Sequence, residues 1–297
     1  MSELAAGALR AAPERVAAAG ELANLWRRLC RNRAAMVGAG IVALFVLLAL
    51  LAPVLVPFNP IQGDLNDRLQ PASGTHWLGT DELGRDVLSR IIVGARVSLQ
   101  IQVVAVVLAL VVGVTLGAAG GYLGGRLDDL IMRAMDVLLA FPSIFLALGI
   151  IAALGTGLVN LMVAAGVSSI PAFARIVRSS VLSLKEREFV EAARALGGGG
   201  GRILFRHLLP NCLAPVIVQA TCRMATVLLT ASGLSFLGLG VQPPTPEWGA
   251  MLSNARSYLI VAPHVATVPG LAIMVVVVGF NLFGDGLRDT LDPRLRQ

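Results

Sequence analysis

Long apolar runs separated by short charged segments dominate the chain from residue 34 onward. A helix needs roughly 20 apolar residues to cross about 30 Å of hydrocarbon, and these runs reach that length. One run, 137–174, is too long for a single crossing and is broken by Gly155-Thr156-Gly157, so it predicts a helical hairpin. The pattern predicts an all-α, polytopic membrane protein with six transmembrane helices, which fall in 34–56, 97–122, 137–174, 216–229 and 263–283.

Composition and charge support a membrane protein and set its expected orientation. Hydrophobic residues make up 56% of the 297 residues and charged residues only 14%, too apolar for a soluble domain. Cytoplasmic loops of membrane proteins retain Lys and Arg, which here gather at 27–33 and 175–206. The expected organisation is a cytoplasmic N-terminal tail (1–33), a first transmembrane helix (34–56), an extracytoplasmic segment (57–96), a core of five transmembrane helices (97–285) with a cytoplasmic loop (175–210), and a cytoplasmic C-terminal tail (286–297).

The cytoplasmic loop 175–210 holds the most informative local pattern. Helical periodicity brings Phe189, Ala193 and Leu196 to one face, and Gly197 is expected to end that helix. A short helix with small alanines, stopped by glycine, can enter a partner's groove with close backbone approach. Charge and periodicity alone favour a solvated connecting loop, because charged amphipathic turns are common between spans. The glycine run 197–201 is interpreted as a flexible turn.

This loop resembles the cytoplasmic loop of permeases from binding-protein-dependent ABC importers. The likeness rests on Glu191-Ala192-Ala193, on Gly197 four residues later, and on Leu209-Pro210. In that family these positions contact the ATPase subunit, so the resemblance implies a coupling role. The glycines that follow Gly197 depart from the family pattern, where more varied residues are usual. The implied coupling residues are Glu188, Phe189, Glu191, Ala192, Ala193, Leu196, Gly197, Leu209 and Pro210.

Other stretches extend the resemblance over nearly the whole chain from residue 25. Residues 76–90, 206–211, 234–249 and 284–293 are similar to the second permease subunit of dipeptide and oligopeptide importers. The resemblance implies a type I ABC importer permease fold in the bacterial inner membrane. Its implied partners are a homologous permease subunit, two ATPase subunits that bind ATP and Mg, an extracytoplasmic peptide-binding protein and the lipid bilayer.

The substrate is open at this point. Dipeptides or short oligopeptides follow from the resemblance, and the same architecture imports glutathione or a chelated metal in related systems. The stretches 169–175 and 262–266 are somewhat closer to a glutathione permease. From a different class, a non-transporting membrane scaffold would need no docking loop.

Several kinds of chemistry are excluded by the residues that the sequence lacks. Lys185 is the only lysine and follows no glycine run, so the chain has no phosphate-binding loop. The Lys and Arg clusters lack interleaved aromatics, which argues against nucleic acid. No catalytic cluster, cofactor site or metal site is expected, because Cys30, Cys212, Cys222 and the histidines are scattered. The carboxylates are expected only at span ends or in loops, so energy must come from a partner.

Two further sites are weaker candidates. Arg223 falls inside the fifth span, where it would face the substrate path or, if the helix begins later, reach the cytoplasmic headgroups. The stretch 232–248 is too rich in Gly and Pro for one regular helix, and it is a candidate for the outer gate or for the platform of a binding protein, with packing under the outer loops as the alternative. Its proposed gate residues are Phe236, Leu237, Gly238 and Trp248. Asp81, Arg85 and Asp86 could equally cap and bridge a short amphipathic helix, where exposed ion pairs add little stability.

Overall fold

The computed structural model describes residues 27 and 29–291, and every regular element in this part of the chain is helical. The predicted tails 1–33 and 286–297 lie largely outside the described residues. Five helices are long and apolar enough to span a membrane. They are α2 (Arg33–Leu55), α3 (Val87–Leu123), α6 (Leu158–Lys185), α10 (Leu213–Phe236) and α12 (His264–Leu291).

Two helices in succession are the candidate for a sixth span. α4 (Gly125–Ala140) and α5 (Ser143–Leu154) pass the same test together, and a bend of 93° separates them. Pro142 lies at this break, where it removes a backbone donor. The hairpin predicted for 137–174 is confirmed at its turn, because Gly155 and Gly157 adopt φ of 88° and 133° between α5 and α6.

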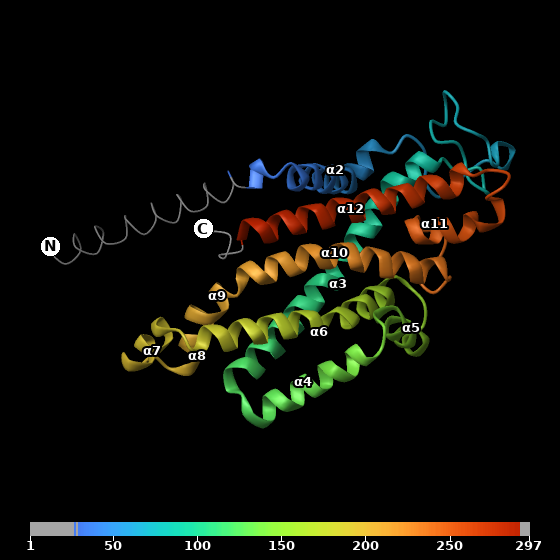
Figure 1. The fold of residues 1–297 in the computed structure, drawn as a ribbon. Helices are drawn as coiled ribbons and strands as arrows, with labels where there is room; N and C mark the ends of the chain where they lie inside the picture. The colour runs from blue at the N-terminus through green and yellow to red at the C-terminus, as the bar shows by residue number, and fades with distance from the viewer. Residues whose placement is uncertain (1–26, 28, 292–297) are drawn as a thin grey trace, which may run out of the picture.

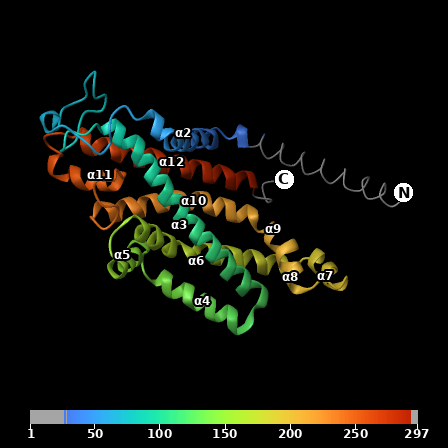
Figure 2. The ribbon, with the colours of Figure 1, turned by 180° about the vertical axis from the view of Figure 1, so that it is seen from behind.

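The long helices lie side by side, and the short elements gather at the two ends of the bundle (Figures 1 and 2). At one end lie α7 (Glu188–Ala195), α8 (Gly200–Ile203), a π-helix η2 (Leu204–Leu208) and α9 (Leu209–Asn211). At the other end lie the segment 57–86, which includes η1 (Leu65–Asp67), together with α11 (Trp248–Ala255) and η3 (Arg256–Tyr258).

Glycines let the long helices approach closely. A Cβ added at Gly113 of α3 would lie 2.5 Å from Phe173 Cβ of α6, and one at Gly38 of α2 would lie 2.5 Å from the Phe283 nitrogen of α12. The hydrophobic effect does not drive helices together in lipid. Small residues at such crossings instead allow close van der Waals packing, which favours their association. These contacts fix α3 against α6 and α2 against α12.

Two element boundaries differ from the sequence prediction. α3 begins at Val87, ten residues before the predicted span, and its 37 residues extend about 55 Å. Its first turns therefore belong to the outer segment rather than to the hydrocarbon layer. The charged stretch after residue 124, expected as a loop, forms α4, so Asp128, Asp129 and Asp136 lie on a helix rather than in a loop.

Candidate functional site

The helix predicted in the loop 175–210 is confirmed as α7. Glu188 and Glu191 lie in its first turn and Arg194 in its last, an arrangement that complements the helix dipole. Val190 is completely buried in a core shared with α3, α6 and α10. Ile203 and Leu208 belong to the same core, so α7, α8 and η2 are anchored to the spans as one unit. Sequence analysis did not single out Val190, although it follows the exposed Phe189 directly.

The end of α7 is a Schellman motif rather than a flexible turn. Gly197, with φ of 78°, donates to the Arg194 carbonyl at 2.9 Å, and Gly198 donates to the Ala193 carbonyl at 2.9 Å. The glycine run then continues directly into α8 at Gly200. The interpretation of 197–201 as a flexible turn is therefore wrong, because its first two residues have defined hydrogen bonds and its last two are helical.

One face of α7 is available to a partner. Phe189 is 41% exposed and Leu196 is 88% exposed. Glu188, Glu191 and Ala192 are also exposed, whereas Ala193 is half-buried. Leu209 is half-buried and Pro210 exposed in α9. The structure thus places the sequence-predicted coupling residues at the same end of the bundle, with an apolar, unpartnered surface at Phe189 and Leu196.

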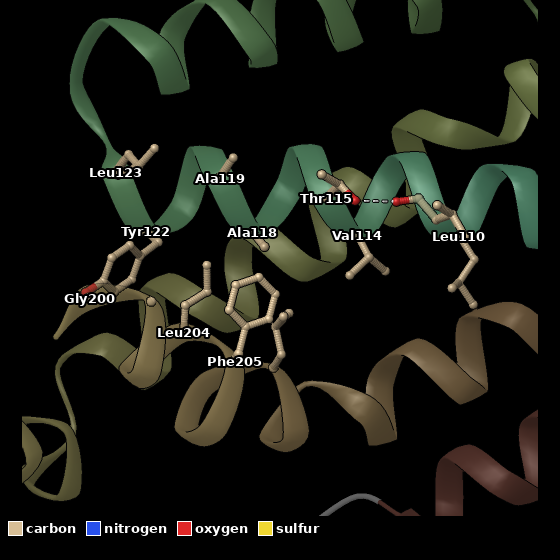
Figure 3. A pocket seen from close by; sticks show the side chains of 13 residues that line it. Leu110, Val114, Thr115, Ala118, Ala119, Tyr122, Leu123, Gly200, Leu204 and Phe205 are labelled. Atoms are coloured by element: carbon tan, nitrogen blue, oxygen red, sulfur yellow. Dashed lines mark hydrogen bonds between the residues drawn. The ribbon is translucent and has the colours of Figure 1, made fainter. Parts of the chain in front are cut away.

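A contact between Lys185 and Tyr122, here called the joint, connects this end of the bundle to the spans. Lys185, at the end of α6, donates from Nζ to the Tyr122 carbonyl of α3 at 3.0 Å and lies 5.9 Å from the centre of the Tyr122 ring. A Cβ at Gly200 would lie 3.0 Å from the Tyr122 hydroxyl, so the ring also packs on α8. Beside it runs an apolar groove of about 720 Å³ between α3 and the segment α8 to α9 (Figure 3). Leu209 lines this groove.

At the opposite end, the proposed gate residues fall into two groups. Phe236, Leu237 and Gly238 are exposed, and the Arg256 guanidinium lies 5.1 Å from the centre of the Phe236 ring. Trp248 is only 2% exposed and donates from Nε1 to the Ile91 carbonyl at 3.1 Å. Trp248 is therefore a core residue in this structure, and only the first three residues retain surface at which a gate would act.

Glu247 holds α11 in place and was not singled out by sequence analysis. Its carboxylate caps the helix by accepting from the Gly249 and Ala250 amides at 3.0 and 2.9 Å. The side chain is 1% exposed. Burial raises the pKa of the Glu247 carboxyl above its ordinary value, and the two backbone hydrogen bonds partly offset this.

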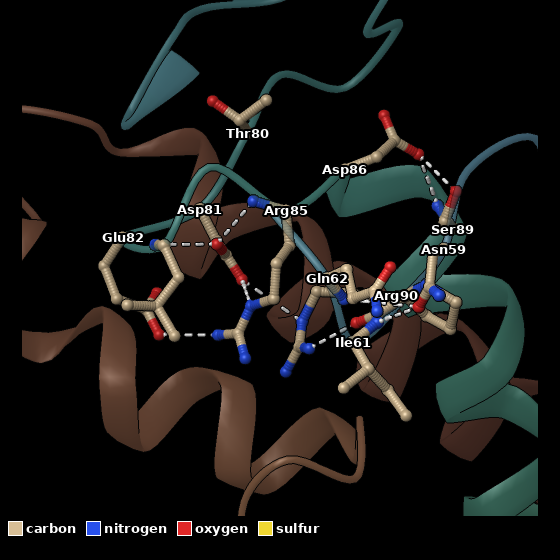
Figure 4. Close-up of polar contacts among 12 residues, drawn as sticks. Asn59, Ile61, Gln62, Thr80, Asp81, Glu82, Arg85, Asp86, Ser89 and Arg90 are labelled. Atoms are coloured by element: carbon tan, nitrogen blue, oxygen red, sulfur yellow. Dashed lines mark hydrogen bonds and ion pairs between the residues drawn. The ribbon is translucent and has the colours of Figure 1, made fainter. Parts of the chain in front are cut away.

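The outer segment is organised by a buried polar network (Figure 4). Asp81 accepts from the Arg85 amide and from Arg85 Nε, at 2.9 and 2.7 Å, and its Oδ2 lies 3.2 Å from Arg90 Nε. Asp86 caps α3 by accepting from the Ser89 amide at 2.7 Å. Asp81, Arg85 and Asp86 are each at most 3% exposed. The helix cap is confirmed for Asp86, whereas the ion pair of Asp81 and Arg85 lies in a buried turn rather than on an exposed helix.

Ion pairs neutralise the carboxylates of α4. Asp128 accepts from Arg178 of α6 in a bidentate pair at 2.5 and 2.6 Å, and Asp136 accepts from Arg175 at 2.6 Å. The expectation that carboxylates lie only at span ends or in loops stays a prediction, because α4 and α5 are a candidate for a broken span. Because these charges are paired between two helices, the sequence pattern of one helix could not reveal them.

Arg223 lies well inside α10. The helix begins at Leu213, so Arg223 is about 15 Å from its start. The helix thus begins earlier than the span expected at 216–229, and the alternative that the Arg223 side chain reaches the cytoplasmic headgroups stays a prediction. No described residue forms an ion pair with Arg223, and its side chain is half-buried.

Two family descriptions match this sequence. Residues 109–297, more than half of the chain, match the binding-protein-dependent transport system inner membrane component. The chain belongs to this family. Residues 22–72 match the N-terminal transmembrane domain of oligopeptide transport permease C, which covers α2. The sequence-based assignment to an ABC importer permease, a membrane subunit and not an enzyme, is confirmed.

Relatives of this permease agree with the family. The chain is 48% identical to the dipeptide transport system permease protein DppC of Alkalihalophilus pseudofirmus over 271 residues, 91% of this chain and 89% of that protein. It is 50% identical to the glutathione transport system permease protein GsiD of Salmonella typhimurium over 274 residues, 92% of this chain and 90% of that protein.

A solved structure supports the fold of the permease. The inward-facing MetNI methionine ABC transporter matches with a TM-score of 0.55 at 19% identity, over 68% of this chain and 97% of that chain. The predicted type I ABC importer permease fold is confirmed. The permease is a multi-span protein of the inner membrane.

Proposed function

We propose that this permease imports short peptides, with energy supplied by ATPase subunits that dock on α7. The single observation that carries the coupling role is the construction of α7. Val190 anchors it in the span core, whereas Phe189 and Leu196 leave apolar surface for a partner. A movement of the docked ATPase subunit would be transmitted to α3, α6 and α10 through the shared core.

The proposed importer contains further subunits besides this permease. A homologous permease subunit would form the other half of the path, two ATPase subunits would bind ATP and Mg, and a binding protein would deliver substrate to the outer segment. The end that carries α7 would be cytoplasmic, because five Lys and Arg residues gather between 185 and 206. The tails 1–33 and 286–297 would then be cytoplasmic, and 57–86 extracytoplasmic.

Glutathione is the second candidate substrate. The identity is 50% to a glutathione permease and 48% to a dipeptide permease, so the permease sequence does not separate the two substrates. A chelated metal is the third candidate. A thermal-shift screen of the cognate binding protein against dipeptides, tripeptides, glutathione and metal chelates separates them, since the binding protein selects the substrate.

Reconstitution tests the function directly. The permease, its homologous partner, the ATPases and the binding protein are placed in proteoliposomes, and uptake of radiolabelled dipeptide and glutathione is measured with and without ATP. We expect ATP-dependent uptake of at least one of them. A purified complex that binds no ATPase and hydrolyses no ATP would favour the scaffold alternative and contradict the proposal.

Arg223 gives a specific prediction for the path. Arg223→Gln is expected to reduce uptake several-fold and to weaken its dependence on ionic strength, because an unpaired intramembrane arginine attracts a substrate carboxylate. Uptake rates at low and high salt measure this. Uptake equal to that of the unsubstituted permease at both salt concentrations would remove Arg223 from the path.

A further inference from the structure

α4 carries a continuous stripe of charge on its exposed surface. Its members are spaced by three, four and three residues, which brings them to one side of the helix. All are exposed, and their signs alternate along the stripe. They are Arg126, Asp129, Arg133 and Asp136.

The other two faces of α4 are different in kind. Asp128, Ile131 and Met135 are buried against the bundle. Leu127, Leu130 and Val137 are exposed and apolar. α4 therefore has separate faces for the bundle, for an apolar environment and for a polar one.

The charged stripe runs along the first half of the bent α4–α5 pair. α4 runs alongside α6 in both views of the bundle (Figures 1 and 2). Asp136 lies in this pair, which is apolar enough to count as one broken span, and Arg175 lies in α6, itself a candidate span. A charge within a span is costly against lipid, so this face must meet water or another protein.

Two ion pairs join the same helices but differ in exposure. In the Asp128–Arg178 pair, the side chains are 11% and 33% exposed, which is typical of an ion pair that holds two helices together. In the Asp136–Arg175 pair they are 60% and 53% exposed. Only the second pair has room for another charged group to approach both partners.

We propose that Asp136 and Arg175 form a binding site in the translocation path for the charged ends of a peptide zwitterion, an inference that rests on the proposed import function. The peptide's ammonium group would donate to the Asp136 carboxylate. The Arg175 guanidinium would donate two parallel hydrogen bonds to a peptide carboxylate. Each protein charge exchanges one partner for another, so no charge is left unpaired in the layer.

The closed ion pair also explains how such a site would release its ligand. Conduction through a membrane path needs a site that binds strongly enough to admit the substrate and weakly enough to let it leave. Arg175 Nη2 lies 2.6 Å from Asp136 Oδ1, so re-forming this ion pair competes with the peptide. Glutathione and ordinary peptides share this zwitterionic chemistry.

Labelling in the reconstituted complex tests whether the pair faces the path. Cys30, Cys212 and Cys222 are first replaced by serine, and single cysteines are introduced by Arg133→Cys, on the charged stripe next to Asp136, and, as a control on the apolar face, Leu130→Cys. We expect a charged methanethiosulfonate reagent to modify position 133 at least about tenfold faster than position 130, and a saturating dipeptide to slow it. Equal rates at both positions, or no protection by dipeptide, would overturn the inference.

Uptake by Asp136→Asn and Arg175→Gln gives the second readout. Each is expected to lower dipeptide uptake about tenfold, the effect of one charge-assisted hydrogen bond, with an unchanged melting temperature of the complex. Asp128→Asn, which removes the more buried ion pair with Arg178, should instead lower the melting temperature. Unchanged uptake by both variants, or loss of the homologous permease from the complex, would contradict a substrate site. Failure of the unsubstituted complex to transport any peptide would contradict the import function itself.

Discussion

A Gly197→Pro substitution is expected to abolish ATP-driven uptake while the membrane spans stay folded. Gly197 has φ of 78°, whereas a proline ring fixes φ near −65°. Proline would also remove the amide that donates to the Arg194 carbonyl. Both changes destroy the Schellman motif, so the chain would leave α7 in a different direction. The exposed face of α7 would then no longer meet the ATPase subunit that we propose to dock there.

Uptake and substrate-stimulated ATP hydrolysis in proteoliposomes measure the result, and both should fall to background. Gly199→Ala is the matched control in the same turn. Gly199 has φ of −65°, and nothing lies within 4 Å of an added Cβ, so alanine should leave uptake unchanged. Normal uptake by Gly197→Pro would show that the path of the chain after α7 has no part in coupling.

A Gly113→Leu substitution should have the largest effect on stability. A Cβ at this position would lie 2.5 Å from Phe173 Cβ and 2.9 Å from the Ile170 carbonyl oxygen of α6. The second neighbour is backbone, which cannot rotate away. Overpacking of this kind costs about 3 kcal/mol, at the upper end of the usual range. The free energy of unfolding should fall by this amount, because α3 and α6 are forced apart.

Thermal unfolding of the purified complex in detergent measures this change, with an expected decrease of about 10 °C in Tm. Gly40→Leu provides the comparison. Gly40 also lies in a span, but nothing is within 4 Å of an added Cβ, so its Tm should change little. Similar Tm values for the two variants would mean that close packing of α3 on α6 contributes little to stability.

The sequence predicted elements well where one helix could be judged by itself. The first span was expected at 34–56 and is observed at Arg33–Leu55. The glycine stop after α7 was expected at Gly197, which has the positive φ that such a stop requires. In these cases the signal lies in local periodicity or in a residue with special backbone freedom.

Features that depend on two distant segments were missed. The charges of α4 suggested a loop, because their partners Arg175 and Arg178 lie about forty to fifty residues further along. Trp248 was proposed as a gate residue, and its burial could not be predicted because its contact with Ile91 crosses 157 positions. The candidate site shows the same division. The exposed residues of α7 were predicted, but the anchor at Val190 depends on packing against other helices.

The joint at Lys185 makes this permease unusually easy to label. Because the chain has no other lysine, its ε-amine is the one internal primary amine for an acylating dye. Its Nζ lies 3.0 Å from the Tyr122 carbonyl, where α3, α6 and α8 meet. A fluorophore attached there would sit at the junction between the α7 unit and the spans. Changes in its emission during ATP turnover would then give a time-resolved optical record of movement at that junction.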